Sequence, residues 1–209
     1  FLFQRPLHAA IVSVRKKMIP SGVTWTGPSI DDVEVLSDVP KELTALLLEA
    51  NGFIVRHGAL HVRGAASTPA WHSLREAWFG ESAFSKLYDA VLPTDVPFAE
   101  DMLGDQFLLR DGLVLRLLAE TGEIEEKESS LASFLARADS DLEAYLNLSL
   151  TREIEPGALL FAAPPFCIQM DSGGYSLKAC PAHEVILIHA DIARQIQSVP
   201  DGGHVVFKI

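Results

Sequence analysis

The stretch DQFLLRDGLVLRLL, residues 105–118, decides the fold. Its two apolar runs, Asp105–Leu109 and Leu113–Leu118, have the period-two character and the length of β-strands. Arg110, Asp111 and Gly112 separate the runs, and an Asp-Gly pair between apolar runs is typical of a tight hairpin turn. The stretch therefore predicts two antiparallel strands joined by a short turn.

The same pattern continues on both sides of this hairpin. Upstream, Val96–Ala99 predicts a short extended segment, and downstream Thr121-Gly122 predicts a turn into Glu123–Glu126. Further upstream, Phe53–Arg56 and Ala59–Val62 predict two more short strands. The middle of the chain is therefore expected to be an antiparallel meander.

Helical patterns lie on either side of these strands. Pro40 opens a helix that Asn51-Gly52 closes, with leucines at helical spacing between them. Ala70–Phe79 predicts a second helix whose tryptophans Trp71 and Trp78 pack in the core. Ser129 or Ser130 caps a third. Helices beside a mainly antiparallel sheet predict an α+β fold.

The last sixty residues predict an additional unit. Strands are expected at Ala158–Ala162, at Phe166–Met170 and in the segment after Tyr175, followed by a helix that Pro181 opens. Within that helix, Val185–Ile188 alone could equally be a strand. With 209 residues, the chain fits one domain plus an extension. We expect an N-terminal segment at 1–29, a core at 30–147, and a C-terminal α/β extension at 148–209 packed on the core.

Composition excludes several classes of protein. No run approaches the roughly 18 apolar residues that a membrane helix needs. The basic residues near the N-terminus follow the apolar stretch, whereas a secretory signal has them in front of it. Cys167 and Cys180 make no disulfide framework and no Cys-x-x-Cys motif, so we expect two buried or half-buried free thiols in the cytoplasm.

The net charge of −11 is concentrated in one segment. Between residues 95 and 128 only Arg110, Arg116 and Lys127 oppose ten acids, which are Asp95, Glu100, Asp101, Asp105, Asp111, Glu120, Glu123, Glu125, Glu126 and Glu128. This disfavours direct nucleic-acid binding, because phosphate contacts need Lys and Arg. It favours a basic protein partner. Solubility alone is an equal alternative explanation.

The motifs described so far resemble those of a known protein family. Residues 30–147 are similar to the SUKH superfamily, the Smi/Knr-type proteins, in the order and spacing of their motifs. The matching pieces are Val39-Pro40, the helix after it, Asn51-Gly52-Phe53, Phe98–Phe107, Gly112-Leu113-Val114, Glu120–Glu123 and Ser130–Leu135. The sequence departs from the family in its short first helix. The family has a tryptophan before the position that Val39-Pro40 matches, and Trp25 is the candidate equivalent here. Residues 148–209 fall outside the family core.

The resemblance implies a role in binding. Bacterial members of this superfamily are thought mostly to be immunity proteins that neutralise toxin domains, often nucleases, and fungal members regulate cell-wall synthesis through protein contacts. An acidic surface suits the inhibitor of a basic nuclease. We therefore expect a non-catalytic protein-binding module, most simply an immunity protein. A regulatory or scaffolding protein is the first alternative, and a small-molecule-binding protein or enzyme is the second.

No pattern in the sequence predicts a catalytic, cofactor or metal site. His57 and His61 lie four residues apart, but in strand and turn, where that spacing does not converge. There is no Gly-x-Ser-x-Gly and no phosphate-binding loop. The expected partner is a basic protein such as a toxin domain, and we expect no direct binding of nucleic acid, no membrane and no cofactor. The candidate partner-binding residues are Trp25, which we expect exposed in a loop, and the acids Asp95, Glu100, Asp101, Asp105, Glu123, Glu125 and Glu126.

Overall fold

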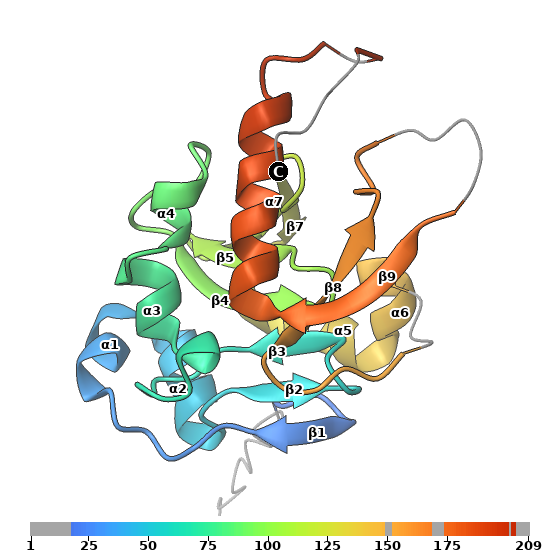
Figure 1. The fold of residues 1–209 in the computed structure, drawn as a ribbon. Helices are drawn as coiled ribbons and strands as arrows, with labels where there is room; N and C mark the ends of the chain where they lie inside the picture. Colours follow the sequence, from blue (N-terminus) through green and yellow to red (C-terminus); the bar gives the residue numbers. More distant parts are fainter. Residues whose placement is uncertain (1–17, 149–151, 169–173, 201, 204–209) are drawn as a thin grey trace, which may run out of the picture.

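A computed structural model describes residues 18–148, 152–168, 174–200 and 202–203. Its centre is a seven-stranded antiparallel sheet in which the strands stand in chain order, β1 to β7 (Figure 1). The strands are β1 (Val23–Thr26), β2 (Phe53–Val55), β3 (Leu60–Val62), β4 (Val96–Asp101), β5 (Gln106–Arg110), β6 (Leu113–Leu117) and β7 (Ile124–Glu128). The predicted meander is confirmed, and it extends over the whole sheet.

The predicted hairpin at residues 105–118 is formed by β5 and β6. Their register pairs Gln106 with Leu117 and Arg110 with Leu113. At the turn, Asp111 and Gly112 have φ values of 51° and 85°. Positive φ at both central residues matches the right-handed twist of the flanking strands, and Asp-Gly tolerates it best.

Helices cover the sheet, and a separate hairpin of two strands follows it. The helices are α1 (Val33–Asp38), α2 (Lys41–Glu49), the 3-10 helix η1 (Ala70–His72), α3 (Leu74–Phe79), α4 (Phe84–Leu87), α5 (Leu131–Ser140), α6 (Leu142–Leu146) and α7 (Ala182–Ile196). The second hairpin is β8 (Ala158–Ala163) with β9 (Ser176–Pro181). The predicted α+β class, with a mainly antiparallel sheet and a C-terminal α/β unit, is confirmed.

Each face of the sheet has its own apolar cluster. On one face, Phe107 of β5 packs against Phe134 of α5 in the larger cluster, which also contains the leucines of α2. On the other face, Leu108 and Leu117 pack with Tyr88 and with Ala190 of α7. Because every second residue of a strand points to the same side, the apolar strands of this sheet support both layers.

The C-terminal unit is bonded to the sheet through its backbone. The Leu160 amide donates to the Met102 carbonyl (2.8 Å), and the Ile154 amide donates to the His57 carbonyl (3.1 Å). Gly157, at the start of β8, lies against the Trp71 indole so closely that a Cβ there would come within 3.0 Å of it. Figure 1 shows α7 and the β8–β9 hairpin beside the sheet.

Several local expectations need correction. Trp71 and Trp78 do not share one helix, because the helix breaks at Ser73, whose hydroxyl accepts from the Glu76 amide (3.3 Å) and caps α3. Val185–Ile188 is helical within α7. Residues 166–168 form a turn and a bend instead of a strand. The remainder of that predicted strand lies outside the described residues, and so does a terminal strand expected at residues 204–209. None of the described helices has the length and apolar character to cross a membrane.

Candidate functional site

A row of polar side chains crosses the interior of the sheet. His61 of β3 stands opposite Glu100 of β4, and Glu100 stands opposite Gln106 of β5. Directly opposed residues on neighbouring strands share a face, so the register places these three side chains in contact. Each is at most 5% exposed. Arg63, which follows β3, is 2% exposed and joins the row.

His72 of η1 extends this row toward the β1 side of the sheet. Its Nδ1 lies 2.8 Å from His61 Nε2, and its Nε2 lies 2.9 Å from the Asn51 carbonyl oxygen. His61 Nδ1 lies 2.9 Å from Glu100 Oε1. The result is a continuous chain of contacts from Asn51 through two imidazoles to Glu100, which we name the histidine wire.

Arg63 satisfies the other oxygen of Glu100. Its guanidinium donates to Glu100 Oε2 (2.6 Å), to Gln106 Oε1 (2.7 Å) and to the Pro97 carbonyl (3.0 Å). A buried ion pair persists only when the remaining donors and acceptors are satisfied, and here they are. Although burial raises the pKa of Glu100, the charge of Arg63 and the hydrogen bond from His61 hold it down at about 2.

The histidine wire is closed to ligands. Three glycines from different segments, Gly27, Gly52 and Gly64, surround the His72 ring, and a Cβ at any of them would come within 3.0 Å of that ring. Trp25 and Trp71 cover it, with ring centroids 4.8 Å and 5.6 Å from that of His72. With no room beside the ring, this cluster is part of the core, and it is not a substrate site.

The two histidine rings are both buried, but they have different electrostatic surroundings. Burial lowers the pKa of His72 to about 4. Burial also lowers the pKa of His61, and the hydrogen bond and charge of Glu100 act in the opposite direction. Only His61 hydrogen-bonds a carboxylate, so only its charged form has a directly bonded negative partner.

Three acids that the sequence assigned to a partner-binding surface are buried instead, so that assignment is wrong for them. Glu100 is part of the row described above. Asp95 is 1% exposed and binds Arg110 through both oxygens (2.6 and 2.7 Å). Asp101 is fully buried at the β4–β5 turn. Asp95 and Glu100 can be buried as carboxylates because arginines from other parts of the chain neutralise them.

Asp101 and Asp105 form a second acidic cluster around Arg116 of β6. The Arg116 guanidinium lies 3.3 Å from Asp101 and 2.7 Å from Asp105, and Asp105 is only partly exposed. Asp101 also accepts from the Leu103 amide (2.9 Å), which fixes the turn. Burial and the neighbouring charge of Asp105 raise the pKa of Asp101 to about 8. These contacts lock the β4–β5 turn to β6.

The remaining predicted residues do reach the surface to different degrees. Glu123, Glu125 and Glu126 are exposed on β7 and immediately before it, and we name them the acidic edge. Trp25 is half-buried in β1, where it packs on Trp71 (5.1 Å between centroids), so the expectation of an exposed loop residue is wrong. The structure thus leaves three of the eight predicted side chains exposed.

A further polar group joins the C-terminal unit to the sheet. Glu120 accepts from the Cys167 amide (2.8 Å), and its other oxygen lies 3.9 Å from Nε2 of the buried His189. Neither ring nitrogen of His189 has a hydrogen-bond partner among the described residues. Burial lowers the pKa of His189 to about 4 and raises that of Cys167 to about 12, which favours the protonated thiol. Cys167 and Cys180 are free and partly buried, as predicted.

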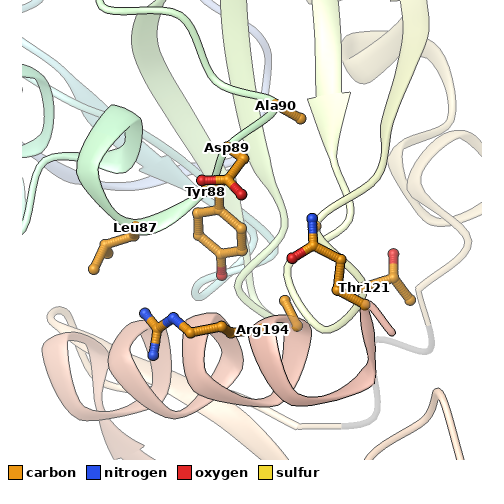
Figure 2. Close-up of a pocket in the computed structure, with 9 residues that line it drawn as sticks. Leu87, Tyr88, Asp89, Ala90, Thr121 and Arg194 are labelled. Atoms are coloured by element: carbon orange, nitrogen blue, oxygen red, sulfur yellow. The ribbon is translucent and has the colours of Figure 1, made fainter. Parts of the chain in front are cut away.

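A small surface pocket opens between α4, the β6–β7 turn and the end of α7. Figure 2 shows Tyr88 at its centre, with Arg194 and Thr121 on the sides facing it. The Tyr88 hydroxyl donates to the Ala119 carbonyl (3.0 Å), and Arg194 pairs with Asp191 (3.2 Å). These two polar groups are therefore engaged within the chain.

No sequence pattern predicts the histidine wire, because the bridge between Gly64 and Ser73 that brings His61 and His72 together forms only in the folded chain. Within the described residues, no three His, Cys, Asp or Glu side chains gather as a metal site.

Comparisons with protein-family models, with curated proteins and with solved structures each gave no match to this chain.

Proposed function

We propose that this chain is a non-catalytic protein-binding module that holds a basic partner at the acidic edge. The observation that carries the proposal is the exposure of Glu123, Glu125 and Glu126 together at one border of the sheet. Side chains of one sign, gathered at one place, attract an oppositely charged partner and orient it.

The charge of the acidic edge is not cancelled from within. Glu125 lies 3.9 Å from Arg116, but that guanidinium is already held more closely by Asp105. Lys127, the basic residue of β7, donates to the Tyr145 carbonyl (2.9 Å), so one of its protons is held within the chain. The acidic edge therefore keeps a net negative charge that is open to a partner.

The backbone of β7 supports the same role. Among the described strands, β7 pairs only with β6, so its other side is the border of the sheet. A border strand presents backbone donors and acceptors that an extended segment can pair with. Acidic side chains on such a strand would favour a basic segment over an acidic one.

The kind of partner follows from the sequence resemblance. A SUKH-type immunity protein acting in the cytoplasm would meet a basic toxin domain, most simply a nuclease. The free thiols Cys167 and Cys180 suit a reducing compartment. A regulatory or scaffolding protein of the Smi/Knr type would instead bind several partners more weakly, and the experiment below separates the two.

The test is capture of the tagged protein from cells that also produce the products of its neighbouring genes, with elution by rising salt. We expect one stoichiometric basic protein, released at high salt, whose nuclease activity this chain blocks. Replacing Glu123, Glu125 and Glu126 by glutamine should weaken binding at least about tenfold. A control with the same charge change at the exposed Glu42, Glu49 and Glu81 should bind normally.

Two outcomes would oppose the proposal. If the acidic-edge variant retains the partner as well as the control does, the glutamates only keep β7 from pairing with other chains, which charged border residues also do. If several weakly held proteins replace one stoichiometric partner, the regulatory alternative is favoured.

A further inference from the structure

The histidine wire ends in a hydrogen-bond acceptor on both sides. At one end is the Asn51 carbonyl oxygen, and at the other is the Glu100 carboxylate. Between them, three contacts of 2.8 to 2.9 Å involve all four ring nitrogens of His61 and His72. At these separations each contact needs one proton between its two heavy atoms.

The three contacts of the histidine wire need more protons than two neutral rings carry. Two neutral imidazoles supply two N–H groups, and neither terminal acceptor supplies one. Two protons leave one of the three contacts as two bare acceptors less than 3 Å apart. We propose that the histidine wire holds a third proton, so that His61 is a buried imidazolium at neutral pH and acts as a proton-dependent latch between η1 and the sheet.

The location of the third proton follows from what faces each ring. The charged and titratable groups around the two rings are Glu100 and Arg63. Glu100 is held as a carboxylate by Arg63, and the buried His72 faces a carbonyl and not a carboxylate. Burial disfavours a charge on His61, but its contact with the Glu100 carboxylate (2.9 Å) opposes that effect. His61 therefore takes the proton on Nδ1 and donates to both neighbours, and His72 is neutral with its proton on Nε2. The Trp71 indole, 5.1 Å from His61 by centroids, also favours a cation there.

A proton fits this geometry and a metal ion does not. Zinc binds imidazole nitrogens at about 2.0–2.1 Å, and tetrahedral coordination would hold two such nitrogens about 3.4 Å apart. The nitrogens of His61 and His72 that face each other are only 2.8 Å apart.

The latch connects segments that are distant in the chain. His72 belongs to η1, Asn51 to the loop before β2, and the Asn51 side chain also binds the Pro28 carbonyl (2.9 Å) after β1. Loss of the third proton would break one contact of the histidine wire and loosen this corner of the fold. Unfolding releases that proton above about pH 6.5, where a free histidine is neutral, so stability should fall as the pH rises.

The test is nitrogen-15 NMR of the full chain with labelled histidine at about pH 8, where an ordinary histidine is neutral. We expect one ring with both nitrogens protonated, and contacts from that ring to the Trp71 indole will assign it to His61. His189, buried without a carboxylate hydrogen bond, is the internal control and should show one protonated and one bare nitrogen. If every ring shows one bare nitrogen, the proposal is overturned.

A variant provides the matched comparison. Glu100→Gln keeps the shape of the side chain but offers an N–H to His61 Nδ1, so two neutral rings then satisfy all three contacts. The imidazolium signal should disappear in this variant, while that of His189 stays unchanged. If the signal persists in a folded Glu100→Gln protein, His61 is not its source. If the variant does not fold, the wild-type spectrum alone decides.

Discussion

Replacing Gly64 by alanine tests whether the His72 ring is as tightly enclosed as the structure shows. Gly64 lies in extended backbone, bonded to η1 through its amide and the His72 carbonyl (3.0 Å). A methyl group at Gly64 would come within 3.0 Å of both the Asn51 carbonyl oxygen and His72 Nε2. These are the two atoms of one hydrogen bond, so the methyl group must separate them or displace the backbone.

The magnitude follows from two costs. Forcing extra volume into a packed core costs about 1–3 kcal/mol. Leaving the His72 nitrogen and the Asn51 carbonyl unpaired in the interior costs about 1–3 kcal/mol more. We expect the Gly64→Ala protein to lose about 2–6 kcal/mol of unfolding free energy, a large part of the roughly 5–15 kcal/mol that a domain has.

The assay is urea unfolding followed by tryptophan fluorescence, since Trp25 and Trp71 both contact His72. With a slope of about 2 kcal/mol per molar urea, the midpoint should fall by roughly 1–3 M. Gly174→Ala is the matched control, because no atom of the described residues lies within 4 Å of a Cβ there. Equal midpoints for the two variants would show that the His72 ring has free space, and the enclosure argument would be refuted.

Three further predictions concern buried charged groups. Arg63→Met should lower the unfolding free energy, measured by chemical unfolding, by about 3–5 kcal/mol, because Glu100 loses its countercharge. Adding Glu100→Gln should recover part of this loss, and no recovery would count against the ion pair. Burial raises the pKa of Asp101 to about 8 in the folded chain, so the wild-type unfolding free energy should fall as pH rises from about 4 to 8, by up to about 1.4 kcal/mol per pH unit. Asp101→Asn should remove most of that pH dependence. An unchanged dependence would show that Asp101 is not the group responsible. Burial lowers the pKa of His189 to about 4, so stability should fall as pH falls from about 6.5 to 4. His189→Leu removes two unpaired nitrogens and should raise thermal stability by about 1 kcal/mol near pH 5, whereas a loss would indicate a bound water or another partner.

The sequence by itself determined the α+β class and most of the meander. These features depend on local chemistry: the Asp111-Gly112 turn between apolar runs, the Ser130 cap of α5, and the apolar stripe of α2. Each is decided by residues close together in the chain, where periodicity and turn preferences act directly. The helix predicted across Trp71 and Trp78 failed at Ser73, because backbone bonding of Gly64 to η1 and α3 overrides helical spacing there.

Only the tertiary structure decided which acids are available at the surface. A count of charges between residues 95 and 128 treats Asp95, Glu100 and Glu126 alike, yet the first two are buried and the third is exposed. The difference comes from strand register, which places Arg110 beside Asp95 and Arg63 beside Glu100. A carboxylate can enter the interior only where a cation from elsewhere in the chain meets it, and that meeting is a property of the folded sheet.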